Sequence, residues 1–267
     1  MKYETNNKVG LIVAGVGAII CIIGTLLLFT RWYDAVIAAE LAAGRPDEAI
    51  IVQYIFPFLS DLGVLAGIFW AIAAHGFGTR RQWAWSVAVI ANVLALQSSF
   101  FPMIPPVTRD LPPYSGLIFL PNLALYGVLL GVVRRVDWRI TVVGLFSGIA
   151  MVLSFMNGVA STDKIIVTGL SLFVAVQRLN WIAAIGWGIF TAALLIKPAE
   201  WVRVVGIGAA ILEIAVGLPL GIATALEAGR FSMFLPAPLL SLALLTLLLL
   251  PWGRQIAPQL KPALTQA

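Results

Sequence analysis

Two carboxylic acids lie inside long apolar stretches of the chain. Asp61 is near the middle of the stretch 51–73, and Glu213 is near the middle of the stretch 204–224. A charged carboxylate at the centre of a bilayer costs about 2.5–3.5 kcal/mol, so it is expected to be neutral, paired or hydrated. Such a group can take up and release a proton, as proton-coupled transport requires. We therefore treat Asp61 and Glu213 as candidate substrate- or ion-binding residues, with helix-to-helix tethering as the alternative.

Polar side chains accompany the two acids at similar depth. Arg178 lies near the start of the stretch 176–196 and either pairs with Asp61 across a symmetry axis or extends to the outer headgroups. Five amides also fall within apolar stretches: Gln53, Asn92, Gln97, Asn122 and Asn157. Each amide alone is explained by an interhelical hydrogen bond of about 0.6 kcal/mol. As a set they predict a polar cavity, and Asn92, Gln97 and Asn122 join the candidate site.

The composition requires that these residues be positioned by membrane helices. Apolar residues make up 61% of the 267 residues and charged residues 11%, against about 25% charge in soluble domains. A helix needs about 20 apolar residues to cross a bilayer. The sequence therefore predicts an all-α bundle of about eight spans: 9–29, 51–73, 83–101, 116–133, 140–160, 176–196, 204–224 and 233–251. A short surface helix is expected around 35–43, stopped by Gly44-Arg45-Pro46, and a second outer connection is expected near 161–175. The first span is too long for a cleaved signal peptide.

Basic residues predict the orientation of the bundle. The chain has 17 Lys and Arg residues. Eleven lie on one side: Lys2, Lys8, Arg80, Arg81, Arg134, Arg135, Arg139, Lys197, Arg203, Arg254 and Lys261. The other six are Arg31, Arg45, Arg109, Lys164, Arg178 and Arg230. The positive-inside rule then places both termini in the cytoplasm and the protein in a plasma or inner membrane.

The spans are predicted to form two repeats of four, residues 1–133 and 134–267. Matching positions carry Gly67-Ile68-Phe69 and Gly188-Ile189-Phe190 in the second spans, and Phe119-Leu120-Pro121 and Phe234-Leu235-Pro236 at the fourth. Four spans in each repeat give both the same direction, hence a parallel repeat. Small residues four apart, as in Gly63–Gly67 and Gly17–Cys21, predict close helix packing.

The sequence offers little for enzyme chemistry. It contains no phosphate-binding glycine loop, no His-Glu-x-x-His and no Ser/His/Asp set. One His (His75) and one Cys (Cys21) give no basis for a metal centre or a bis-histidine haem, and no cofactor is expected. The net charge of +5 is spread over short loops, so nucleic acid is not an expected partner.

These patterns leave three functions open. The first is a small transporter or permease-like protein with a polar site between the repeats and a small molecule or ion as substrate. The second is a non-catalytic membrane subunit or assembly factor that binds another membrane protein or a second copy. The third, with enzyme activity less expected than its absence, is an enzyme acting on a lipid through His75 or an intramembrane acid.

Overall fold

The chain folds entirely into helices over the part that the structure describes. The computed structural model describes residues 5–250, apart from the side chains of Thr30, Glu227 and Ala228, and every regular element in this range is helical. This confirms the all-α prediction. The chain divides into two compact units, Met1–Val136 with Thr162–Leu170, and Asp137–Ser161 with Ser171–Ala267. Their positions relative to one another are not determined, and each is described by itself.

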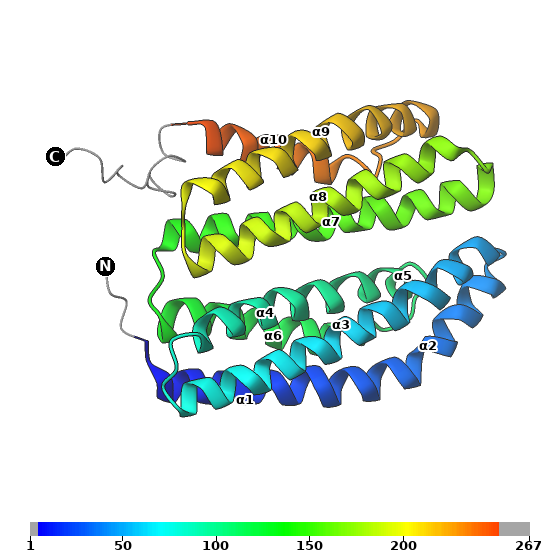
Figure 1. Ribbon diagram of the computed structural model, residues 1–267. Coiled ribbons are helices and arrows are strands. Elements are labelled where there is room, and N and C mark those ends of the chain that lie inside the picture. Colours follow the sequence, from blue (N-terminus) through cyan, green and yellow to red (C-terminus); the bar gives the residue numbers. More distant parts are fainter. Residues whose placement is uncertain (1–4, 251–267) are drawn as a thin grey trace. The chain divides into compact units, whose positions relative to one another are not determined.

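Unit 1 is built on one long N-terminal helical run. Its elements are α1 (Asn7–Ile19), η1 (Ile20–Gly24), α2 (Thr25–Ala42), α3 (Pro46–Gly78), α4 (Ala84–Phe100), η2 (Phe101–Met103), α5 (Ile104–Val107), α6 (Gly116–Val128) and η3 (Leu129–Val133). The π-helical turn η1 joins α1 to α2, so residues 7–42 form one run beside α3 (Figure 1). The separate surface helix predicted around 35–43 is therefore the end of α2, because no Gly or Pro interrupts residues 25–42.

The turn between α2 and α3 follows from its sequence. Gly44 has φ 71°, a left-handed conformation that glycine adopts without strain. The Arg45 amide donates to the Glu40 carbonyl at 3.0 Å, and the Gly44 amide donates to the Leu41 carbonyl at 3.0 Å. Pro46 then occupies the first position of α3, where its missing N–H costs nothing. The chain reverses over three residues and brings α2 back along α3.

Small residues let α3 approach the N-terminal run closely. A Cβ atom added to Gly17 would lie 2.7 Å from the Trp70 indole, and one added to Gly67 would lie 3.0 Å from the backbone nitrogen of Ile22. A Cβ on Gly63 would lie 2.8 Å from the Thr25 hydroxyl. The close packing predicted from these small-residue spacings is confirmed.

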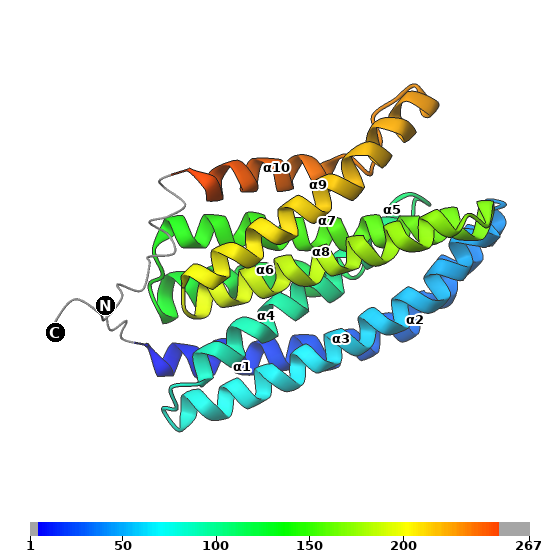
Figure 2. The same cartoon turned by 45° about the horizontal axis from the view of Figure 1, so that its top comes forward.

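The other helices are α7 (Trp138–Thr168), α8 (Ser171–Ile196), α9 (Glu200–Ala228) and α10 (Pro236–Leu249). Unit 2 contains α8, α9, α10 and the part of α7 up to Ser161, while the last turns of α7 belong to unit 1. Helix α9 packs against both α8 and α10 (Figure 2). The sequence predicts a connection over 161–175, but helix continues to Thr168 and resumes at Ser171, broken where Gly169 has φ 66°.

Seven of the described helices are long and apolar enough to cross a membrane. They correspond to the first seven predicted spans. The eighth corresponds to α10, an apolar helix of 14 residues, and its last predicted residue, 251, lies outside the described range. The orientation rests partly on Lys2, Arg254 and Lys261, also outside that range. The eight-span count, the orientation and the repeats 1–133 and 134–267 stay predictions.

Candidate functional site

Glu213 lies in the middle of α9 and is fully enclosed. Its exposed fraction is 0%. With 1.5 Å rise per residue, it lies about 20 Å from either end of the 29-residue helix. The helix has no Lys, Arg or His between Arg203 and its end at Ala228, so no cation on α9 offsets the acid. The sequence-predicted site residue therefore lies buried at the middle of a long apolar helix.

Asn157 of α7 holds one oxygen of the acid. Its side-chain nitrogen donates to Glu213 Oε1 at 3.1 Å and to the Phe234 carbonyl at 3.1 Å. A carboxamide has two N–H donors, so both of them are used. Asn157 is 3% exposed. This one amide connects α7, α9 and the segment entering α10.

The other oxygen of the acid has no such partner. Glu213 Oε2 is buried and makes no hydrogen bond within the described residues. The Ser154 hydroxyl, one turn before Asn157 on α7, lies beside the carboxyl group, yet it too lacks a hydrogen bond of acceptable geometry there. A small rotation of either side chain would join them. The site thus has a fixed half at Oε1 and an adjustable half at Oε2.

The space beside the acid is made by Gly217. A Cβ atom at this position would lie 2.8 Å from Glu213 Oε1 and 3.3 Å from the Pro238 ring. Only glycine therefore leaves the carboxyl group its present position. Residues of three segments of unit 2 converge on this one carboxyl group, which can exist in a charged or a protonated form.

Asp61 and Arg178 are placed differently. Asp61 is exposed on α3 at the surface of unit 1, and Arg178 is exposed on α8 at the surface of unit 2. Within its own unit, neither side chain has a hydrogen-bond or ion-pair partner among the described residues. Their pairing stays a prediction.

The candidate amides of unit 1 form a separate buried cluster. The Asn92 side chain donates to the Asn122 carbonyl at 3.0 Å, and the Asn122 side chain donates to the Ile118 carbonyl at 2.8 Å. The Cys21 thiol lies 3.6 Å from Asn122 Oδ1. These contacts join η1, α4 and α6. Gln97 is buried on α4 with its carbonyl oxygen unpaired within the described residues.

Sequence reasoning missed two pairings. Asn157 was recognised as a buried amide, but nothing in the sequence shows that it faces Glu213, 56 residues away. Glu40 and Arg109 were counted only as charges of connecting segments. Arg109 Nε donates to Glu40 Oε2 at 2.8 Å, and Glu40 is 2% exposed. The only sequence feature that points to either pairing is the low number of acids in the chain, which draws attention to Glu213 and Glu40.

His75, the residue named for lipid chemistry, lies exposed in the last turn of α3. Its carbonyl accepts from the Thr79 hydroxyl at 2.9 Å. This placement gives no support for a catalytic role. Comparison of the chain with protein-family models, with curated proteins and with solved structures found no match, so its function has to be inferred from the geometry of its own residues.

Proposed function

We propose that the chain, whose helices are long and apolar enough for a multi-pass membrane protein, is a small transporter or permease in which Glu213 carries the coupling proton or cation. The observation that supports the proposal is that only one oxygen of the buried Glu213 carboxyl group accepts a hydrogen bond among the described residues. An ionisable side chain buried in a membrane helix is a functional candidate by default, and Glu213 is enclosed without a cationic partner on its own helix.

The geometry supports exchange between two states of Glu213. In the charged state, the carboxylate receives one donor, from Asn157, and Oε2 gains a second from Ser154 only if one of these side chains rotates. In the protonated state, the carboxyl O–H finds an acceptor only after Ser154 or the carboxyl group rotates. In neither state does the carboxyl group make all the hydrogen bonds that it can make. A carboxyl group with all its hydrogen bonds in one state would be held in that state. This balance favours release and uptake over permanent occupancy.

The experiment is transport in proteoliposomes. The full chain is reconstituted, and solid-supported-membrane currents are recorded on adding pools of amino acids, sugars or monovalent cations, with and without a proton gradient. We expect substrate-dependent currents that fall at least about tenfold in Glu213→Gln, because that change removes the exchangeable proton; such a loss corresponds to ~1.4 kcal/mol. Proton and Na⁺ gradients applied separately identify the coupling ion.

A matched control lies on the same helix. Glu200 is exposed in the first turn of α9, so Glu200→Gln changes the same chemical group at the helix end and is expected to keep the currents. Circular dichroism and size-exclusion chromatography check that each variant folds. Currents that persist unchanged in Glu213→Gln combined with Asp61→Asn would show that neither acid drives transport.

A second candidate function, a membrane subunit, is favoured by the exposed face of α3. Asp61 lies on a stripe of exposed side chains with Tyr54, Phe58, Leu65 and Ile68. An acid in such a stripe requires a polar or basic neighbour in the membrane. Purification in a mild detergent tests this: a stoichiometric partner that is lost in Asp61→Leu and retained in Glu200→Gln favours the subunit, and a protein that transports without any partner excludes it.

A further inference from the structure

The orientation of the Asn157 amide beside Glu213 is fixed by a backbone group. The Phe234 carbonyl can only accept a hydrogen bond, so the Asn157 atom that lies 3.1 Å from it is the nitrogen. The same nitrogen lies 3.1 Å from Glu213 Oε1. The amide oxygen cannot take this position without the loss of both bonds. An N–H donor therefore faces Oε1 whether the carboxyl group is charged or neutral.

The backbone around the acid does not offer the oxygens that a metal cation requires. Such an ion takes several oxygen ligands, and Na⁺ sites in transporters draw on unwound backbone carbonyls. Helices α7 and α9 are continuous past the acid, so their carbonyls bond within the helices. Pro219 leaves the Ala215 carbonyl without an amide donor, but Ala215 is exposed on α9. The Phe234 carbonyl, which precedes α10, is already bonded to Asn157.

The side chains around the acid offer equally little to a metal cation. Glu213 is fully enclosed, and a methyl group on Gly217 would already lie 2.8 Å from Oε1. Near the carboxyl group, Ser154 supplies one hydroxyl oxygen. Over the part of the chain that the structure describes, no three His, Cys, Asp or Glu side chains are grouped to hold a metal ion. A proton needs no ligand shell, because it is held in a covalent O–H bond and needs one acceptor.

No counter-charge stabilises a carboxylate at this position. Among the described residues, the side chains that interact with the Glu213 carboxyl group are one hydroxyl and one amide, both uncharged. Helix α10 contains no charged residue. In α7, α8 and α9, the charged residues lie within about two turns of a helix end: Arg139, Asp163, Lys164, Arg178, Glu200, Arg203 and Glu227. A buried carboxylate without such a partner costs more than the neutral acid.

We propose that Glu213 carries a proton and not a metal cation, with the proton on Oε2 and the Ser154 hydroxyl as its acceptor. Because the Asn157 N–H donates to Oε1, that oxygen is the carbonyl oxygen of the neutral acid, and Oε2 is the oxygen that is protonated. The proton comes from water and returns to water when the site opens; one O–H bond forms and breaks, and Ser154 keeps its own proton. As the identity of a coupling ion, the inference rests on the function proposed above.

Infrared spectroscopy of the full chain in nanodiscs tests the proposal without transport, because a neutral carboxyl group has a C=O stretching band that a carboxylate lacks. The Glu213 band is isolated as the difference between the protein and Glu213→Gln. We expect this band to titrate with pH, with the same midpoint in Na⁺-free and Na⁺-rich buffer. If Na⁺ competed for the same oxygens, the midpoint would fall by about one pH unit for each tenfold rise in Na⁺ above its dissociation constant.

Two variants of α7 test the assigned roles. Asn157→Ala removes the donor to the C=O group, and Ser154→Ala removes the acceptor of the O–H group. Both are expected to move the band to higher frequency, Asn157→Ala by more, because its bond is to the C=O group itself. Ser147→Ala is the matched control, since Ser147 is buried about two turns earlier on α7 and its hydroxyl lies 2.8 Å from that of Thr191. It is expected to leave the band unchanged.

The outcomes separate this proposal from the proposed function. A midpoint that falls as Na⁺ rises, no Glu213 band at neutral or mildly acidic pH, or a band that Ser154→Ala does not shift would overturn the proposal, even if transport currents are observed. A band that is independent of Na⁺ in a protein without currents would contradict the transporter and leave the proton on Glu213. If Asn157→Ala folds poorly, Ser154→Ala and the Na⁺ comparison still decide.

Discussion

The bond between Asn157 and Glu213 gives the sharpest test of the candidate site. Asn157→Ala removes two hydrogen bonds of 3.1 Å, one to Glu213 Oε1 and one to the Phe234 carbonyl. At about 0.6 kcal/mol for each interhelical bond, their loss amounts to ~1.2 kcal/mol. Glu213 then has no donor at either oxygen, and a stranded buried group adds about 1–3 kcal/mol. We expect Asn157→Ala to lower the free energy of unfolding by about 2–4 kcal/mol.

A double-mutant cycle separates the bond from the lost volume. Unfolding is measured in bicelles by steric trapping for Asn157→Ala, Glu213→Ala and the double variant. The two effects should deviate from additivity by about 0.6–1.7 kcal/mol, the range of single membrane hydrogen bonds. Ser241 is the matched control, because its hydroxyl accepts from Trp187 Nε1 at 3.3 Å, a separate contact in unit 2; Ser241→Ala should add to Asn157→Ala without coupling.

Additivity of the Asn157 and Glu213 substitutions within about 0.3 kcal/mol would refute this reasoning. It would mean that the two side chains do not meet in the folded protein. The fixed half of the site would then not exist, and the proposed exchange at the other oxygen would lose its geometric basis. Transport currents measured on the same variants show whether the bond also matters for function.

Three further predictions concern helix packing, a hydrogen bond to a backbone carbonyl, and the space beside Glu213. In a thermal unfolding assay, Gly67→Ala should lower the free energy of unfolding by about 1–3 kcal/mol, because the added methyl overpacks the helix contact. Gly127→Ala, with no atom within 4 Å of the added methyl, should leave stability unchanged or raise it. Tyr33→Phe should lower the free energy of unfolding by about 0.6–1.7 kcal/mol, because the Tyr33 hydroxyl donates to the Gln53 carbonyl, which Pro57 leaves without an amide donor. In a Pro57→Ala background, where an amide can bond that carbonyl, the same change should lower it by less. Gly217→Ala should reduce transport currents without unfolding the protein, because its methyl would lie 2.8 Å from an oxygen of the buried acid.

Several features of the fold were predictable from local sequence. The apolar stretches predicted the helices because a membrane helix satisfies all its backbone groups internally. Gly44 and Pro46 predicted the break after α2, since both residue types interrupt a helix largely independently of their surroundings. The predicted helix around 35–43 was wrong as a separate element, because no Gly or Pro interrupts residues 25–42 and the helix continues past the end of the apolar stretch. The connection predicted over 161–175 was too long for a similar reason, because polar residues near a membrane surface do not stop a helix.

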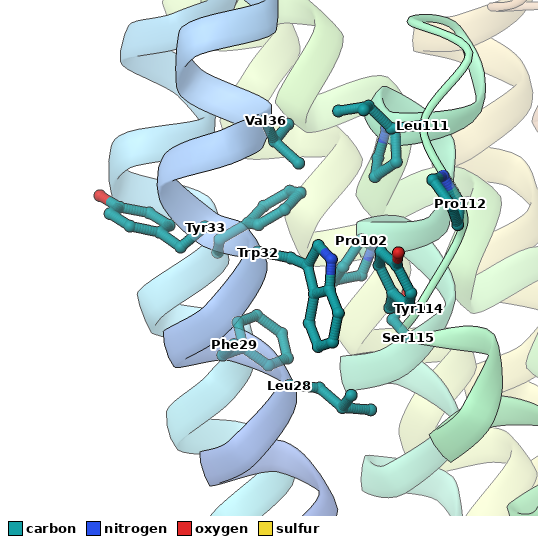
Figure 3. A pocket seen from close by; sticks show the side chains of 12 residues that line it. Leu28, Phe29, Trp32, Tyr33, Val36, Pro102, Leu111, Pro112, Tyr114 and Ser115 are labelled. Carbon is teal, nitrogen blue, oxygen red and sulfur yellow. The ribbon is translucent and has the colours of Figure 1, made fainter.

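The sequence by itself determined the helical class of this protein, the length and apolar character of its helices, and the presence of Asp61 and Glu213 inside apolar stretches. Those properties depend on residue type and on spacing along one helix. Only the tertiary structure decided that Glu213 is enclosed and clamped by Asn157 while Asp61 lies at the surface of its unit. It likewise brought Arg109 to Glu40, 69 residues away, and placed the Tyr114 ring against Trp32 at a pocket of unit 1 (Figure 3). Pairing across helices depends on the rotation of each helix about its axis, which a nearly uniform apolar pattern does not encode.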